Sequence, residues 1–175
     1  MKTPVNRIIF CILLLLPVLS TLVYPQDTSL RRPINSSNSG KPKHKAGNRR
    51  AINPAGISPL LPAYSIAVRA GDLVFVSGMT GIKPGTQDIV EGGIAVQTQQ
   101  ALDNIRTSLQ PAGATMSDVA ECTVFLLDMA DFGAMNEVYV KFFPSDPPAR
   151  ATVAVSALPR PAARVEIKCS AVVQH

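Results

Sequence analysis

The distribution of apolar and polar residues between positions 65 and 173 predicts five strands and two helices. Apolar residues that recur every three or four positions, as from Ile94 to Leu109 and from Phe132 to Phe143, are typical of amphipathic helices. Short apolar or alternating runs bounded by turn residues are typical of strands. This order of elements indicates an α+β domain in which both helices pack on one face of a mixed sheet. The predicted strands span residues 65–69, 73–77, 119–127, 151–155 and 164–173.

Two cysteines of this region, Cys122 and Cys169, fall on the apolar faces of predicted strands. We interpret both as small buried hydrophobic residues rather than nucleophiles. They lie far apart in the sequence and form no C-x-x-C pair, which argues against a zinc site. The two histidines, His44 and His175, lie outside the predicted elements, which argues against a histidine-based triad or metal site within the domain.

The first 25 residues are predicted to form a targeting segment. Lys2 and Arg7 precede an unbroken apolar run at positions 8–16, and further apolar residues follow Pro17. This pattern is typical of a signal peptide. The alternative is an uncleaved membrane anchor through residues 8–24, although the run is short of the roughly 20 residues that a spanning helix needs. The segment therefore predicts a protein that is exported (periplasmic or secreted) or anchored to a membrane by its N-terminus.

Residues 26–50 are predicted to be a disordered basic linker, because their polar and basic composition leaves little apolar surface to bury. The globular domain is then expected over residues 51–175. The whole chain has a formal charge of +5, but residues 51–175 contain eight basic and eleven acidic residues, a net charge of −3. A domain that binds nucleic acid usually carries positive charge on its own surface, so this distribution disfavours nucleic acid as a partner.

Six short segments, spread over residues 52–173, form a pattern in a fixed order. They are Ala63-Tyr64-Ser65-Ile66-Ala67-Val68, Val74-Phe75-Val76-Ser77-Gly78, the stretch from Gln97 to Asn104, Val124-Phe125-Leu126 with Asp131-Phe132 and Asn136, Pro148-Ala149-Arg150-Ala151-Thr152, and Leu158-Pro159 with Val165-Glu166-Ile167. Together these segments resemble the Rid family, the reactive intermediate deaminases or YjgF-type proteins. The resemblance covers the whole predicted domain and none of the N-terminal segment.

The resemblance implies a YjgF/chorismate-mutase-like fold that assembles as a homotrimer, with ligand sites in clefts between subunits. Transferred residue by residue, it implies that Arg150 holds the substrate carboxylate while other side chains close the cleft around it. The implied substrate-binding residues are Arg150, Tyr64, Ser77, Gly78 and Thr152, and the implied catalytic residues are Arg150 and Glu166.

The implied activity is hydrolysis of reactive 2-imino (enamine or imine) acids to 2-keto acids and ammonia. A guanidinium binds a planar carboxylate at two points, which suits Arg150 to this role. Glu166 is the only acid in the closing strands and is suited to orient or deprotonate the attacking water. This chemistry requires no metal, cofactor or covalent intermediate. From the residues alone, a solvated loop position for Arg150 and a cross-strand ion pair for Glu166 remain alternatives.

Three residues depart from patterns common in the family. Met79 follows the Ser77-Gly78 pair where the family often has glutamine, Ile66 stands where glutamine or histidine is common, and Thr152 stands where some members have cysteine. Arg150 within the Pro-Ala-Arg motif favours the deaminase, whereas Met79, Ile66 and the predicted export favour an alternative function. That alternative is a non-catalytic trimer of the same fold, which binds a small carboxylate ligand or offers its surface to a partner.

Overall fold

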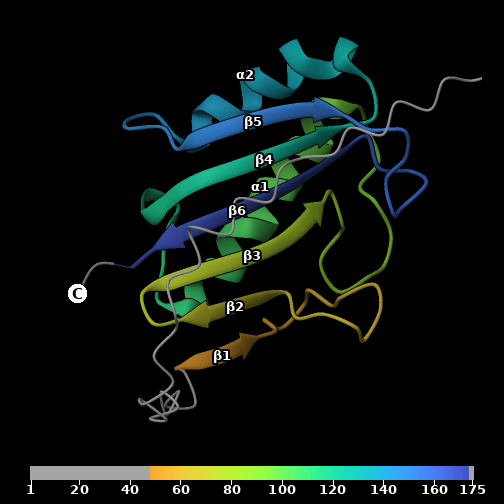
Figure 1. Ribbon diagram of the computed structural model, residues 1–175. Coiled ribbons are helices and arrows are strands. Elements are labelled where there is room, and N and C mark those ends of the chain that lie inside the picture. Colours follow the sequence, from red (N-terminus) through yellow and green to blue (C-terminus); the bar gives the residue numbers. More distant parts are fainter. Residues whose placement is uncertain (1–47, 174–175) are drawn as a thin grey trace, which may run out of the picture. The chain divides into compact units, whose positions relative to one another are not determined.

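A computed structural model of the chain describes residues 48–173, which form one six-stranded sheet and two α-helices (Figure 1). Both the predicted targeting segment and the predicted linker up to residue 47 lie outside the described residues. Within the described part, no helix is long and apolar enough to cross a membrane. The strands are β1 (Arg49–Ile52), β2 (Ala67–Ala70), β3 (Leu73–Thr80), β4 (Val119–Leu126), β5 (Ala149–Ala154) and β6 (Val165–Val172), and the helices are α1 (Ile94–Leu109) and α2 (Phe132–Phe142).

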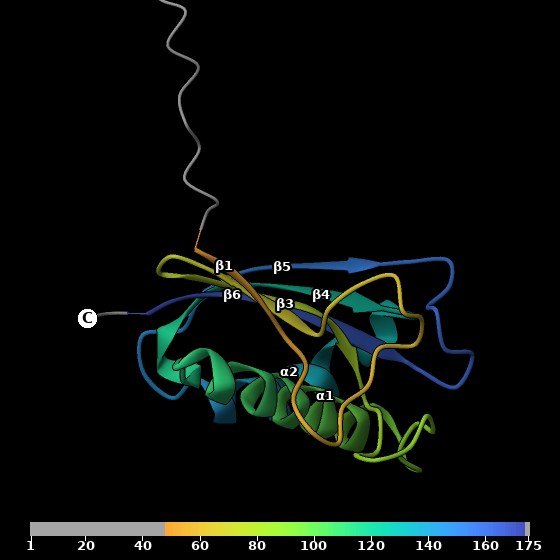
Figure 2. The same cartoon turned by 90° about the horizontal axis from the view of Figure 1, so that it is seen from below.

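The sheet has the strand order β1-β2-β3-β6-β4-β5, so the last strand of the chain lies between β3 and β4. All neighbouring strands are antiparallel except β4 and β5, which are parallel and joined through α2. Figure 2 shows both helices on one side of the sheet, and no element within residues 48–173 covers the other side. This arrangement confirms the predicted α+β class with helices on one face.

Strand β1 was not predicted, and it begins inside the segment interpreted as a linker. Arg49 pairs with Ala70 of β2 and Arg50 pairs with Arg69, so the sheet includes residues before position 51, where the domain was expected to begin. Only Ile52 of this edge strand is buried, and Arg50 donates a hydrogen bond to the carbonyl oxygen of Pro111. Main-chain pairing at the sheet edge, rather than an apolar pattern, therefore holds this strand in place.

The core lies between the helices and the covered face of the sheet. The apolar stripe of α1 is buried as predicted, from Ile94 to Leu109. In β6 the alternation is equally clear, since Val165, Ile167, Cys169 and Ala171 are buried and the residues between them are not. Alternate residues of a strand point to opposite faces. Glu166 therefore lies on the face of the sheet away from the helices.

The stripe predicted for the second helix is partly different in the structure. Met135, Tyr139 and Phe143 are buried as expected, but Phe132 is 37% exposed. Phe132 is the first residue of α2, and its ring lies near the guanidinium of Arg150. Phe132 thus fits the helical spacing of the apolar stripe, but it is an exposed neighbour of a charged group and is not part of the core.

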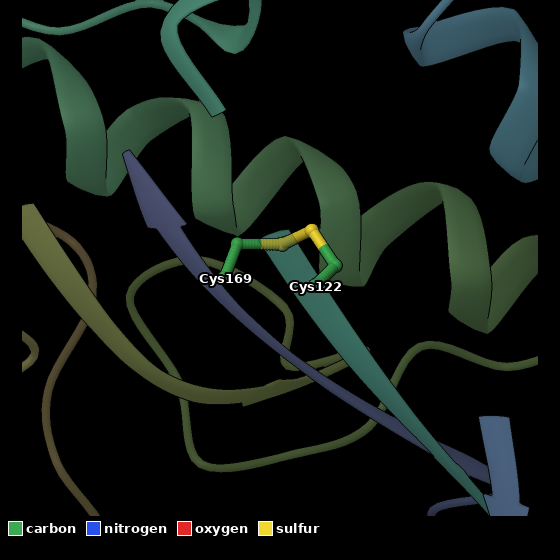
Figure 3. Close-up of a disulfide and its surroundings, with 2 residues drawn as sticks. All are labelled: Cys122 and Cys169. Carbon is green, nitrogen blue, oxygen red and sulfur yellow. A yellow bond between two sulfur atoms is a disulfide. The ribbon is translucent and has the colours of Figure 1, made fainter. Parts of the chain in front are cut away.

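The two buried cysteines are joined in a disulfide, which the interpretation as free hydrophobic residues missed (Figure 3). Cys122 of β4 and Cys169 of β6 are direct partners in the antiparallel register, and their Cα atoms are 4.1 Å apart. Their spacing of 47 residues gives no sign of the bond, because only the pairing of β4 with β6 brings them together. The disulfide joins the neighbouring strands β4 and β6 on the helical face of the sheet.

Replacing both Cys122 and Cys169 with alanine is expected to lower the free energy of unfolding by about 2–4 kcal/mol. A cross-link between residues so far apart restricts the unfolded chain strongly. Chemical denaturation of the full-length chain, with and without a thiol reductant, measures the difference. The reductant should lower the stability of the parent protein to that of the double variant and leave the variant unchanged. Equal stability of both proteins under both conditions would contradict a disulfide in the folded chain.

Candidate functional site

Four of the predicted site residues line one pocket of about 410 Å³, here called the Glu166 pocket. Tyr64 comes from the segment before β2, Ser77 and Gly78 come from β3, and Glu166 comes from β6. Residues that the sequence analysis did not single out complete the pocket: Leu60, Leu61, Thr80, Ile82, Pro159 and Arg160. The pocket is thus partly apolar, with a few converging polar groups, as small-molecule sites commonly are.

An irregularity in β3 shapes the floor of this pocket. The register between β3 and β6 shifts between Val76 and Met79, so Ser77 and Gly78 form a bulge opposite β6. The carboxyl group of Glu166 lies directly over Gly78, and a Cβ atom at that position would overlap the carboxyl oxygen Oε1. Glycine is therefore required at position 78 for Glu166 to adopt this position.

The hydroxyl groups of Tyr64 and Ser77 have complementary hydrogen-bonding capacity. The Tyr64 oxygen accepts a hydrogen bond of 2.9 Å from the backbone N–H of Leu60, which leaves its own proton to donate. The Ser77 hydroxyl donates to the carbonyl oxygen of Ser65 at 2.8 Å, which leaves its lone pairs to accept. The pocket can therefore both donate to and accept from a small polar ligand.

Glu166 is half-buried, and burial raises the pKa of its carboxyl group above the usual value. The predicted alternative, an ion pair on the sheet surface, is not realised, since the ion pairs within residues 48–173 involve other residues. A carboxyl group without a cationic partner, and with a raised pKa, is suited to accept a proton from water near neutral pH.

Arg150 lines a different pocket, of about 360 Å³, here called the Arg150 pocket. Its guanidinium lies 4.6 Å from the ring centroid of Tyr139 and donates a hydrogen bond of 2.8 Å to Oδ1 of Asn136. Stacking and this hydrogen bond together fix the direction of the guanidinium fork. The remaining lining residues are Val140, Phe143, Pro147 and Pro148.

The ring of Tyr139 stacks against the guanidinium of Arg150, and the Tyr139 hydroxyl group is neutral. Burial raises the pKa of its hydroxyl to about 12, and the positive charge of Arg150 opposes this shift only in part. The hydroxyl oxygen is buried without a hydrogen-bond partner in the described structure. Asn136 and Tyr139 occupy one face of α2, spaced three residues apart, and neither was predicted as a site residue although Asn136 belongs to a quoted motif.

Within one chain, the two pockets share no lining residue. Arg150 pairs with Cys122 across β4 and β5, which places it on the helical face of the sheet, whereas Glu166 lies on the open face. Thr152, two residues after Arg150, lines neither pocket, and its hydroxyl is buried without a partner. The structure therefore divides the predicted residues between two separate pockets, and the substrate-binding role of Thr152 stays a prediction.

Comparison with known proteins gives one consistent family. A family model described as Endoribonuclease L-PSP matches residues 57–173. A "2-iminobutanoate/2-iminopropanoate deaminase" from Mus musculus is 42% identical over 119 residues, which are 68% of this chain and 84% of the mouse protein. The protein DfrA from Myxococcus xanthus is 41% identical over 126 residues, which are 71% of this chain and 95% of that protein. Among solved structures, RidA from an Antarctic Psychrobacter superimposes with a TM-score of 0.67 at 35% identity and covers 71% of this chain and 99% of its own.

Replacing Glu166 with glutamine is expected to stabilise the protein at pH 7. A carboxyl group whose pKa is higher in the folded state binds its proton more tightly there, so the free energy of unfolding falls as pH rises from about 4.5 through the folded-state pKa. The glutamine of the variant does not ionise, so its free energy of unfolding does not fall in this way. Its advantage over the parent protein, measured by denaturant titration, should therefore be larger at pH 7 than at pH 4.

Glu121→Gln is the matched control, because Glu121 is an exposed carboxylate on the neighbouring strand β4. It should change the free energy of unfolding by less than about 0.5 kcal/mol at either pH. A Glu166→Gln variant that is less stable than the parent protein at pH 7 would show that the ionised carboxylate has a stabilising partner.

Proposed function

The chain belongs to the family described as Endoribonuclease L-PSP, and we propose that it hydrolyses small 2-imino acids to 2-keto acids and ammonia. The observation that carries the proposal is the pair formed by the Arg150 pocket and the Glu166 pocket, which we interpret as the two half-sites of one active site. One presents a fixed guanidinium, and the other presents a carboxyl group of raised pKa among hydroxyl groups. Imine hydrolysis needs both, namely an anchor for the substrate carboxylate and a base for water.

In the proposed mechanism, Arg150 binds the substrate carboxylate through two N–H groups and draws electron density from the adjacent C=N carbon. Glu166 accepts a proton from a water molecule as the water oxygen bonds to that carbon. That proton passes to the nitrogen and gives a carbinolamine. The hydroxyl proton of the carbinolamine then also passes through Glu166 to the nitrogen as the C–N bond breaks, so that ammonia leaves with both water protons and the C=O bond forms. Tyr64 and Ser77 orient the water and the polar atoms of the substrate.

This mechanism requires a second copy of the chain, and we place the active site between subunits of a homotrimer. Arg150 lies on β5, at the edge of the sheet, where β4 is its only neighbouring strand in the described structure. The open face of the sheet carries exposed apolar residues, including Leu73, Phe75 and Val172. An edge half-site and an apolar open face both favour assembly that brings Arg150 of one subunit to the Glu166 pocket of another.

Two alternatives to catalysis by these residues have less support. Met79 and Ile66, the departures that favoured a non-catalytic protein, are buried in the core and line neither pocket. They therefore leave the polar groups of both half-sites unchanged. The family description also names a ribonuclease, but residues 48–173, with Arg49 and Arg50 of β1 included, carry ten basic and eleven acidic residues. Their net charge of −1 disfavours binding to a polyanion.

We also place the protein outside the reducing compartment of its cell, exported or held at a membrane by its N-terminus. The Cys122–Cys169 disulfide supports this, because structural disulfides form and persist mainly in oxidising compartments. The basic residues Lys2 and Arg7 before an apolar run support it independently. Whether the segment is a cleaved signal peptide or an anchor is decided by N-terminal sequencing of the mature protein.

Replacing Arg150 tests the proposed activity. Arg150→Lys keeps the charge but loses the planar fork, so imine hydrolysis should slow by about one to two powers of ten, the worth of a charge-assisted hydrogen bond. Arg150→Ala should cost more. The assay generates the imine in place with an amino-acid oxidase and follows its decay with a semicarbazide trap.

Arg106→Ala is the matched control, because Arg106 also stacks on a ring of α2, that of Phe142, but lines neither pocket. It should keep full activity. Light scattering and melting curves show whether each variant remains folded and assembled. Full activity in a folded Arg150→Ala protein would refute Arg150 as the carboxylate anchor, and a parent protein that does not accelerate imine decay would refute the enzymatic function.

A further inference from the structure

Arg160 is a buried guanidinium without an acidic partner. Its side chain is only 8% exposed, and its Nη1 and Nη2 atoms donate to the backbone oxygen and to Oε1 of Gln87, at 2.6 and 2.7 Å. The ion pairs within residues 48–173 join Arg106 to Asp103 and Arg164 to Asp131, and neither includes Arg160. A buried charge that only neutral groups solvate is costly unless an anion compensates it.

Arg160 faces space that a ligand can occupy. It lines the Glu166 pocket and also an adjoining depression of about 370 Å³, whereas Glu166 lines only the pocket. Arg160 therefore lies at the border between these two spaces. Gln87 occupies two of its five N–H donors, so up to three remain for a ligand.

A second polar group of the pocket also lacks a partner. Thr80 is 4% exposed, it lines the Glu166 pocket, and its hydroxyl oxygen makes no hydrogen bond within the described structure. Buried hydroxyl groups are normally satisfied. Thr80 thus has an unsatisfied hydroxyl group, covered from solvent, in the wall of the pocket that Arg160 also lines.

The loop that carries Arg160 is held firmly. Gln97 of α1 donates to the carbonyl oxygen of Ala162 at 3.0 Å and accepts from the backbone N–H of Arg164 at 2.8 Å. The side chain of Arg164 makes two further hydrogen bonds to Asp131. A cation on a fixed loop is pre-organised for a ligand, because binding orders little additional chain.

We infer that Arg160 and Thr80 form a subsite for a second acidic group, so that the protein prefers 2-imino acids whose side chains carry a carboxylate. This inference rests on the proposed function, in which Arg150 already binds the carboxylate next to the imine. A purely structural role for Arg160 would be to connect the segment around Gln87 to the loop between β5 and β6. That role explains its two hydrogen bonds but neither its unpaired charge nor its position in the pocket.

The test compares two imines in the full-length protein, one made in place from glutamate and one from 2-aminobutanoate by suitable oxidases. The parent protein should show the higher kcat/KM with the glutamate-derived imine. In Arg160→Met the ratio of the two kcat/KM values should fall about tenfold to a hundredfold. Arg160→Lys should restore part of the ratio, and Thr80→Val should lower it by a smaller factor.

Arg69→Met is the matched control, because Arg69 also donates to backbone oxygens, those of Gly71 and Ala112, but lines neither the Glu166 pocket nor the adjoining depression. The ratio of the two kcat/KM values in the Arg69→Met variant should equal that of the parent protein. Arg160→Gln is a second neutral variant that can still bond to the Gln87 side chain, in case Arg160→Met does not fold.

Calorimetric titration with the stable products separates this inference from the proposed function. The parent protein should bind 2-oxoglutarate more tightly than 2-oxobutanoate, and both neutral Arg160 variants should lose that preference. A parent protein without the preference, or Arg160 variants with an unchanged ratio or an equal loss for both ligands, would overturn the subsite. Hydrolysis of neither imine, with an Arg160-dependent preference for 2-oxoglutarate, would overturn the proposed activity and retain the subsite.

Discussion

The covering of only one face of the sheet by helices determines where the functional groups lie. In β6, alternate residues pack under α1 and α2, so Glu166 between them must lie on the uncovered face. Arg150 lies beside Cys122 on the helical face, where Tyr139 and Asn136 of α2 hold it. One chain therefore presents the guanidinium and the carboxyl group in opposite directions, and a site that uses both needs two chains.

The polar groups of both half-sites occupy positions that weaken the fold. Glu166 is half-buried with a raised pKa, Arg160 is buried without a carboxylate, and the hydroxyl of Tyr139 has no partner. Each of these arrangements has a free-energy cost in an empty site. The disulfide and the packed core offset such costs elsewhere in the domain, which is the usual distribution in proteins whose polar groups bind ligands.

Much of the fold could be predicted because its core strands and helices have clear periodicity. The alternation in β6 and the stripe of α1 correspond to buried residues in the structure. Strand β1 has no such pattern, since two of its four residues are arginines and only Ile52 is buried. The disulfide was also missed, because the contact between Cys122 and Cys169 depends on strand register rather than on sequence spacing.

The sequence indicated candidate site residues but not their arrangement in space. Family resemblance indicated Tyr64, Ser77 and Glu166, and the structure brings them to one pocket. The family resemblance gave no indication of Arg160. A lone arginine after Leu158-Pro159 cannot be distinguished from a surface residue until its burial is known. The separation of Arg150 from Glu166 was equally hidden, since it depends on which face of the sheet each strand presents.

The central claim is that Arg150 of one subunit and Glu166 of another complete one active site. Co-expression of two inactive chains, Arg150→Ala and Glu166→Gln, with different affinity tags allows mixed assemblies to be isolated and assayed for imine hydrolysis. If each site takes one residue from each of two subunits, the isolated mixed trimers regain about a third of the parent activity, because every mixed trimer contains one intact site of three. Mixed assemblies that remain as inactive as the separate variants would contradict the account.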